Sequence, residues 1–523
     1  MSSCIDAGRR RFVSGLAYTG CCLLVPPWAG RLLGAPAARG VPLGVQAGDV
    51  TYDSAVLWSA CDRTAQMAVR YATNERLRDA QRRLGPLATP ASGGTAKLVL
   101  TGLPPGQEVF YEVRFLDPHT GRPVSDPVYG RLRTPARDRR SVSFLWSGDT
   151  VGQGWGINPD FGGLKIYESM RRLQPDFFIH SGDLIYADIP LQRQVPLPGG
   201  GLWRNLVTEE KSRPAQTLED FRGCYRYNLM DEHLRRFCAE VPQYVQWDDH
   251  EVSNNWYPGR VLDDPRRTER RCEVLVPRAR QAFAEFTPLT PQPPDRPCIH
   301  RVFHRGPLLD LFLVDLRSFR GPNSPGRQRV LTPQARILGA AQAEWLKQQL
   351  RTSTALWKVI AADMSLGLVV ADDGWRATAV DGVAQGDPEA LGRELEIAEL
   401  LSFLRRHRIY NVVWLTADVH YAATHRFDPG RARFSDFDPF YEFVSGPLHA
   451  GPFGPNQLDA TFGPQLLYQR CPPQPNLPPS AGYLHFGHVH IDGRTGIMTV
   501  SHRGLEGQLL HRVELVPQLD SAG

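Results

Sequence analysis

The chain has 523 residues, more than a single hydrophobic core usually serves, so two domains are the default expectation. Its 42% apolar and 22% charged residues are typical of a soluble globular protein. Of the 60 basic and 55 acidic residues, four Arg and one Asp lie in residues 1–37, so the rest of the chain carries a net charge of only about +2. A charge this small argues against stable nucleic-acid binding and against a membrane-surface role held by net charge.

Residues 1–37 are predicted to be an export signal rather than part of the fold. Arg9-Arg10-Arg11-Phe12 resembles the twin-arginine pattern, a moderately apolar stretch follows, and Ala35-Pro36-Ala37 offers a cleavage site. A Sec-type signal or a short anchor is the alternative. We therefore expect the twin-arginine export machinery as a partner and a periplasmic or secreted location. No other segment is long and apolar enough to span a bilayer, so we expect no transmembrane segment in the mature chain.

Residues 40–135 are predicted to form a small β-sandwich domain of the immunoglobulin or fibronectin kind. Short strand-like runs such as "DSAVLWSACD", "QMAVRYAT" and "EVFYEVRFLD" are separated by turn residues. Arg133 to Ser141 is the expected linker to a second domain over residues 141–517. An oxidising compartment would allow disulfides among the Cys residues beyond the signal, but their pairing cannot be predicted, and the absence of a C-x-x-C pair argues against a zinc ribbon. Those residues are Cys61, Cys224, Cys238, Cys272, Cys298 and Cys471.

From Val142 onward the pattern changes to apolar strands that alternate with helices, which predicts an α/β domain. "SVSFLW" and "PDFFIH" flank the helical "GLKIYESMRRL". Further on, "WKVIAA" and "NVVWL" each follow a helix. Three Pro-rich stretches, Pro190–Pro198, Pro288–Pro297 and Pro472–Pro479, are predicted to be loops.

Four of the predicted strands end in acidic or histidine residues. Carboxyl ends of strands in an open α/β sheet meet at a ligand-binding edge. Carboxylates crowded there would repel one another unless cations lay between them, so the pattern predicts one or more metal ions. The strand ends carry Asp149; Asp183 with Tyr186; Asp248, Asp249 and His250; and Asp418 with His420.

The order of these motifs resembles that of the calcineurin-like metallophosphoesterases, and "WDDHEVSNNW" points to the PhoD-type alkaline phosphatases. The resemblance covers almost the whole mature chain, since "GVQAGDVTYDSAVLWSACD" is similar to that family's N-terminal domain. It implies a two-sheet α/β sandwich over residues 141–517, preceded in the chain by the small all-β sandwich. It also implies a secreted alkaline phosphatase or phosphodiesterase that hydrolyses phosphate esters through a metal-bound hydroxide.

The resemblance also implies roles for single residues. Asp183 would bridge two metal ions, Asp149 would hold the first, and Tyr186 would bind a ferric ion as a phenolate. Iron with calcium is the implied pair, and Mn, Zn or Mg would also suit oxygen ligands. The family's best-known enzyme has a Cys ligand in its first motif, so Asp149 leaves the metal pair open.

The later motifs supply the remaining implied groups. Asp249 stands where related enzymes carry a metal-binding Asn, and His250 would contact the phosphate and assist the leaving oxygen. Asp418 and His420 would close the metal site from the last strand.

Four further residues have two interpretations each. Arg317 could bind phosphate oxygens or form an ordinary ion pair. Asp363, after "WKVIAA", could be a further metal ligand or not. Asn254 and Asn255 could bind substrate or cap a turn. A nucleotidase or a phospholipase D-like hydrolase on the same fold remains an alternative function, as does a non-catalytic metal-bound surface protein.

A second histidine motif, "FGHVH" at residues 486–490, also has the form of a metal-binding strand end. Its surroundings alternate like an antiparallel strand, and Asp492-Gly493 predicts a hairpin turn. Because Asp418 and His420 already supply the terminal pair, we predict that His488 and His490 lie in a late β-hairpin beyond the active site and bind no metal.

Overall fold

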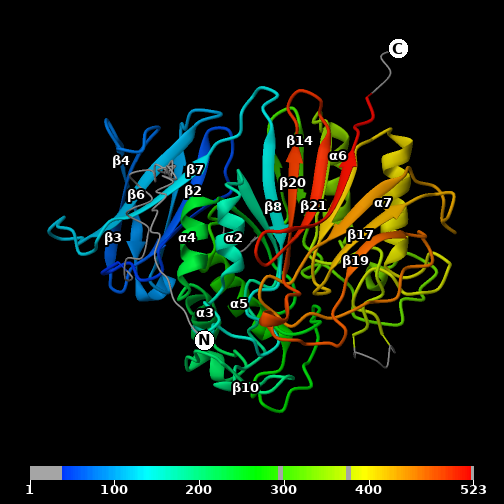
Figure 1. The fold of residues 1–523 in the computed structure, drawn as a ribbon, viewed down its shortest axis with the longest axis horizontal. Coiled ribbons are helices and arrows are strands. Elements are labelled where there is room, and N and C mark those ends of the chain that lie inside the picture. Colours follow the sequence, from blue (N-terminus) through cyan, green and yellow to red (C-terminus); the bar gives the residue numbers. More distant parts are fainter. Residues whose placement is uncertain (1–37, 293–297, 373–378, 520–523) are drawn as a thin grey trace, which may run out of the picture.

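The computed structural model describes residues 38–292, 298–372 and 379–519, so the predicted export signal lies outside the described residues. Two large β-sheets pack face to face in it (Figure 1). The first has nine strands in the order β22 (Leu509–Leu515), β21 (Met498–Gly504), β20 (His485–Ile491), β8 (Val142–Ser147), β9 (Phe177–Ser181), β12 (Gln243–Gln246), β1 (Val45–Gly48), β2 (Ser54–Ala60) and β5 (Thr95–Thr101). The second has seven in the order β13 (Arg301–His304), β14 (Leu309–Leu313), β15 (Trp357–Ala361), β16 (Val412–Thr416), β18 (Phe440–Val444), β17 (Ala422–Phe427) and β19 (Gln465–Arg470).

Helices cover the outer faces of both sheets, so the predicted two-sheet α/β sandwich is confirmed. The first sheet packs against α2 (Ile166–Arg172), α3 (Leu218–Asn228), α4 (Glu232–Glu240) and α5 (Cys272–Phe286). The second sheet packs against α6 (Ala340–Thr352) and α7 (Glu394–Arg406). No helix within the described ranges has the length and apolarity needed to cross a membrane. The six Cys residues predicted to remain after export are all unpaired.

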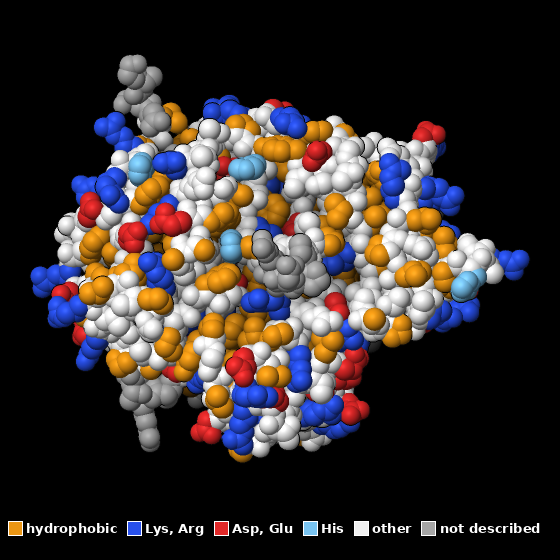
Figure 2. Space-filling view, turned by 180° about the vertical axis from the view of Figure 1, so that it is seen from behind, with side chains coloured by type: hydrophobic (Ala, Val, Ile, Leu, Met, Phe, Trp, Pro, Cys, Tyr) orange, Lys and Arg blue, Asp and Glu red, His pale blue; other side chains and the backbone are white. Residues whose placement is uncertain are grey.

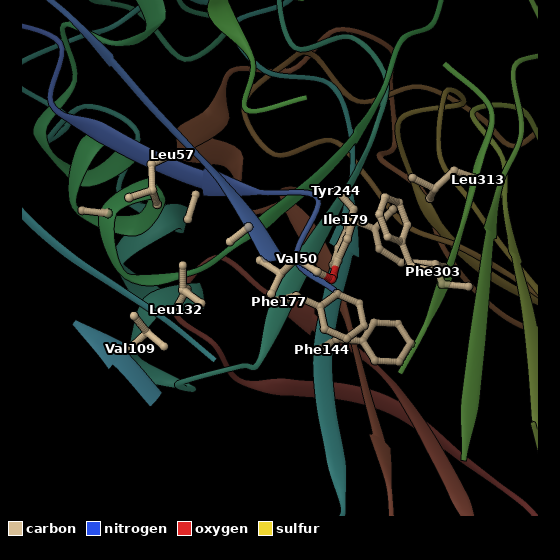
Figure 3. Close-up of a cluster of buried hydrophobic side chains, with 14 of the residues drawn as sticks. Val50, Leu57, Val109, Leu132, Phe144, Phe177, Ile179, Tyr244, Phe303 and Leu313 are labelled. Atoms are coloured by element: carbon tan, nitrogen blue, oxygen red, sulfur yellow. The ribbon is translucent and has the colours of Figure 1, made fainter. Parts of the chain in front are cut away.

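The core between the sheets follows from strand alternation. Phe144 and Trp146 of β8 point into it while Leu145 points to the helices, because successive side chains of a strand face opposite ways. Phe144 stacks on Phe177 of β9 with ring centroids 4.7 Å apart (Figure 3). The indole N–H of Trp146 donates to the carbonyl of Thr416 in the second sheet at 3.2 Å. The ring stack joins neighbouring strands of the first sheet, and the Trp146 hydrogen bond links the two sheets near their carboxyl ends.

The N-terminal region forms the predicted β-sandwich, but one of its layers belongs to the large sheet. Its separate layer has four strands in the order β4 (Gln81–Ala88), β3 (Ala65–Ala72), β6 (Glu108–Leu116) and β7 (Val128–Arg133). The other layer, β1, β2 and β5, continues the first sheet through the pairing of Gly48 with Gln243 of β12. The division into domains at residues 40–135 and 141–517 stays a prediction, and the sheet runs across it.

One predicted loop differs in the structure, and one predicted hairpin has a further partner. The Pro190–Pro198 stretch is not purely loop, since β10 (Gln194–Pro196) pairs with β11 (Leu202–Arg204) in a short hairpin. The strand that carries "FGHVH", β20, forms the expected hairpin with β21, and it also pairs with β8, the strand that leads to Asp149.

Charged side chains of both signs are mixed on the face of the molecule that Figure 2 shows. On the side shown in Figure 2, Lys and Arg side chains are scattered with Asp and Glu among them. This mixture agrees with the near-neutral net charge of the chain without residues 1–37.

The sandwich interior holds histidines that burial keeps neutral. His502 lies on β21 with Nε2 3.0 Å from the hydroxyl of Thr424, and burial lowers the pKa of His502 to about 3. Burial likewise lowers the pKa of His485 to about 4. An unfolded chain binds protons on these rings below pH ~6.5 while the folded chain does not, so their contribution to stability is lost as the pH falls below that value.

We therefore expect the free energy of unfolding to fall by about 1.4 kcal/mol for each such histidine between pH 7.5 and pH 5.5. In urea titrations at the two pH values, His502→Gln should have a smaller pH dependence than the wild type by about that amount. His119→Gln, at an exposed turn, is the matched control and should keep the wild-type dependence. An unchanged pH dependence in His502→Gln would contradict this assignment.

Candidate metal centre

The ligand-bearing loops lie at one edge of the two sheets because their strands run in parallel. β8, β9 and β12 are parallel neighbours in the first sheet, and β14, β15 and β16 are parallel neighbours in the second. Each of these six strands is followed by an Asp two residues after its last residue. These are Asp149, Asp183, Asp248, Asp315, Asp363 and Asp418.

Several of the predicted ligands come together in three overlapping groups whose ligand atoms lie within 4.8 Å of one another. All are buried except Asp418, whose side chain is 12% exposed. The groups are Asp149, Asp183 and His420; Asp183, Asp249 and His250; and Asp248, Asp249 and Asp418. Asp183 and Asp249 each belong to two groups, which suits carboxylates placed between neighbouring cations.

His420 presents one particular ring nitrogen to the first group. Its Nδ1 lies 2.6 Å from the carbonyl oxygen of Gly451, which can only accept, so Nδ1 carries the proton. Nε2 is then free to act as a ligand and lies 3.4 Å from Oδ1 of Asp149. A histidine whose second nitrogen donates to a carbonyl in this way has its tautomer and ring orientation fixed.

Tyr186 lies between the first two groups. Its hydroxyl is 2.8 Å from Nε2 of His420, and its ring packs over that of His250 with centroids 4.2 Å apart. Burial, with the nearby carboxylates of Asp183 and Asp149, raises the pKa of Tyr186 well above its usual value. A phenolate would therefore need a positive charge beside it.

His250 is oriented by a carboxylate that the sequence analysis did not single out. Its Nδ1 lies 2.7 Å from Oδ1 of Asp188, and its backbone N–H donates to Asp183 at 3.1 Å. Burial acts against protonation, but Asp188 and Asp249 outweigh it and raise the pKa of His250 to about 9. The only sequence signal for Asp188 was its place at the end of "GDLIYAD".

Arg317 lies wholly buried beside the third group. Its Nε is 2.5 Å from Asp248 and its Nη1 is 2.8 Å from Asp381. The ion pair that was one of its two expected roles is thus present, and the phosphate contact stays a prediction. Asp363 has a carboxylate oxygen 3.8 Å from Nε of Arg317 and belongs to none of the three groups.

The carboxylates of the site fit metal ions because their charges and hydrogen-bonding capacity are not otherwise met. Three aspartates have buried carboxylate oxygens that accept no hydrogen bond. These are Oδ2 of Asp149, Oδ2 of Asp418 and both carboxylate oxygens of Asp363. Burial, and then neighbouring carboxylates such as Asp248, raise the pKa values of Asp149, Asp363 and Asp418 well above normal. Buried unpaired acceptors of this kind are stabilised by bound cations.

Glu251 holds the backbones of two ligand loops together and was also missed from sequence. Its carboxylate accepts from the backbone N–H groups of Leu184 at 2.7 Å and Asp248 at 2.8 Å, and from that of Asp183 at 3.3 Å. The side chain is fully buried. The loops after β9 and β12 are therefore positioned relative to each other by one residue of the "WDDHE" motif.

The two Asn residues have different environments. Asn254 is exposed, and its backbone N–H donates to Oδ2 of Asp188 at 2.8 Å. Asn255 is buried, and its side-chain amide donates to the carbonyl of Asp372 at 2.9 Å, which is a loop-holding contact. A substrate contact stays a prediction for both.

His488 lies apart from the three groups. Its Nε2 is 2.9 Å from the hydroxyl of Ser143, and His490 is exposed at the surface. Neither residue belongs to a potential metal-binding group among the described residues. That they bind no metal remains a prediction.

Known proteins share this architecture. The solved structure of PhoD has a TM-score of 0.67 at 19% identity, covering 93% of this chain and 94% of that chain. Purple acid phosphatase PPD1 from yellow lupin (Lupinus luteus) seeds has a TM-score of 0.56 at 12% identity, covering 91% of this chain and 74% of that chain. At these identities the two likenesses establish the fold alone.

Sequence comparison identifies the family. Alkaline phosphatase D of Bacillus subtilis (strain 168) is 27% identical over 399 residues, which are 72% of this chain and 64% of that protein, so the match spans less than two thirds of the relative. The family model for the PhoD-like phosphatase N-terminal domain matches residues 30–136. The model for the PhoD-like phosphatase itself matches residues 144–502, more than half of the chain. The chain therefore belongs to the PhoD-like phosphatase family.

Proposed function

We propose that this chain is an exported, metal-dependent phosphoesterase that hydrolyses phosphate monoesters or diesters. The observation that carries the proposal is the convergence of five aspartates and two histidines from four strand ends in three overlapping groups. The similarity to alkaline phosphatase D supports the reaction class. The twin-arginine-like start of the sequence supports export to the periplasm or beyond, with the twin-arginine machinery as partner.

The donor set suits hard or borderline cations. The residues that would hold them are Asp149, Asp183, Tyr186, Asp249, Asp418 and His420. Fe³⁺ with Ca²⁺ is the expected pair, and the oxygen-rich set would also accept Mn, Zn or Mg. Bound metal ions lower the pKa of a coordinated water and polarise phosphoryl oxygens.

The protein's own groups handle the leaving oxygen and the substrate. His250, held by Asp188, is the group that can donate a proton from Nε2 to the departing oxygen. Asp188 stabilises the imidazolium and fixes which nitrogen faces the site. Arg317 lies beside the three carboxylates of the third group and limits their mutual repulsion. The exposed Asn254 would contact the ester group.

Purified protein is expected to contain at least about two equivalents of metal and to hydrolyse p-nitrophenyl phosphate or its bis ester at alkaline pH. Chelation should remove both the metal and the activity. Asp183→Ala should lose metal because Asp183 belongs to two of the ligand groups.

Elemental analysis measures the metal, and a panel of monoester, diester, nucleotide and phospholipid separates a general phosphatase from a nucleotidase or phospholipase D-like hydrolase. A fully metallated protein that hydrolyses none of these would overturn the proposal in favour of a non-catalytic role.

Asp188→Asn should impair esters with poor leaving groups most. Removing the carboxylate charge weakens the imidazolium of His250, and general acid catalysis typically contributes about 10²-fold or more. We expect kcat for an alkyl phosphate to fall by about that factor, while kcat for p-nitrophenyl phosphate, whose leaving group needs no proton, falls less. Equal losses for both esters would argue against this role for Asp188.

The two histidine motifs should respond differently to substitution. His420→Ala is expected to lose metal and activity, since Nε2 of His420 faces Asp149 at 3.4 Å. The double variant His488→Ala, His490→Ala is expected to keep its metal and most of its activity, because neither residue belongs to a ligand group. Elemental analysis and hydrolysis of p-nitrophenyl phosphate are measured on both, and metal loss from the double variant would show that "FGHVH" does bind metal.

A further inference from the structure

In the Pro-rich segment Pro472–Pro479, the exposed Asn476 contacts two loops that adjoin the candidate metal centre. Five proline rings and a left-handed backbone at Asn476 (φ 56°) shape the stretch "PPQPNLPP". Proline fixes its own φ, and Asn is among the few residues that tolerate a positive φ. The side chain of Asn476 is thereby held out on a stiff loop.

Asn476 contacts the loop that follows Asp149. Its Oδ1 accepts a hydrogen bond of 2.8 Å from the indole N–H of Trp155, whose side chain is buried. Its side-chain amide also lies 3.5 Å from the carbonyl of Gln153. This loop begins directly after Asp149. The backbone N–H groups of Val151 and Gly152 in it donate to the carbonyl of His449 at 2.7 and 3.0 Å.

Asn476 also contacts the backbone that orients His420. Its N–H donates to the carbonyl of Pro452 at 2.8 Å. Its Oδ1 lies so near Gly451 that a Cβ at that position would be only 1.8 Å away. The carbonyl of Gly451 is the acceptor, at 2.6 Å, for Nδ1 of His420. One side chain thus lies against the peptide that sets the tautomer and direction of this histidine.

We propose that Asn476 is a positioning residue for the metal centre. It ties the loop after Asp149 to the Gly451–Pro452 peptide, so that Nε2 of His420 stays directed at the ligand groups. The inference rests on the proposed function only in taking His420 as a metal ligand. It assigns a role to a Pro-rich segment more than 50 residues beyond His420 in the chain.

The test uses variants that keep the left-handed backbone. Asn476→Gly removes the side chain, and Asn476→Asp retains an oxygen that can accept from Trp155; both tolerate positive φ. Metal-loaded proteins are incubated with EDTA, and the metal left on the protein is followed by elemental analysis. Supporting contacts behind a ligand typically change metal affinity 10–100-fold, so Asn476→Gly should release metal about tenfold faster than the wild type. Asn476→Asp should release it at close to the wild-type rate.

Two further measurements separate positioning from general loosening. Gln474→Ala, at an exposed position of the same loop, is the matched control and should leave metal release unchanged. Hydrogen–deuterium exchange should be faster over residues 450–456 in Asn476→Gly, but unchanged over β9 and α7. Trp155→Phe should also speed metal release, and combining it with Asn476→Gly should add little, because both remove the same hydrogen bond.

The outcomes distinguish this inference from the proposed function. If the wild type binds metal and hydrolyses phosphate esters but Asn476→Gly releases metal at the wild-type rate, the positioning role is wrong and the proposed function stands. Faster release from Gln474→Ala as well would assign the effect to the loop as a whole and overturn the role of Asn476. A wild type without metal would instead overturn the proposed function.

Discussion

Repulsion among buried carboxylates is the constraint on which the rest of this structure depends. Parallel strands of two sheets bring their carboxyl ends to one edge, and each of six strands is followed two residues later by Asp. The buried Arg317 lies within 4 Å of five carboxylates. One guanidinium cannot balance that charge, so the arrangement is stable with the carboxylates ionised only when cations bind between them.

The surrounding residues keep these like charges in place. Glu251 fixes the loops after β9 and β12 through backbone N–H groups, without using the side chains of the candidate ligands Asp183 and Asp249. Asp149, Asp183 and Asp418 all have positive φ values, a strained conformation that persists only where neighbours enforce it. Gly182 meets a steric need of the same kind, since a Cβ there would lie 2.5 Å from Cβ of Asp248. The positive φ values, Gly182 and the buried Glu251 all allow several carboxylates to lie close together at one edge of the sheets.

Sequence was sufficient for features that lie next to one another in the chain. Asp149 and Asp418 follow directly on apolar strands, so their strand-end placement could be predicted, and motif order then indicated the family. The partners of these ligands could not be predicted in the same way. His250 pairs with Asp188 across 62 positions, and Asn476 meets Trp155 across 321, so only the fold brings them together. Asp363 illustrates the converse, because it has the same strand-end position as the ligands and yet belongs to none of the three groups.

The placement of β1 links the N-terminal region to the edge where the candidate metal ligands lie. β12 carries Asp248, Asp249 and His250 at its end, and its outer side pairs with β1. Tyr244 of β12 donates its hydroxyl to the carbonyl of Val50 at 2.6 Å, and Trp58 of β2 donates to Glu285 at 2.7 Å. Without β1, the strand that carries these ligands would have an unpaired edge, which is a site for fraying and for wrong pairing. The N-terminal sandwich is thus part of what holds the loop after β12 in register.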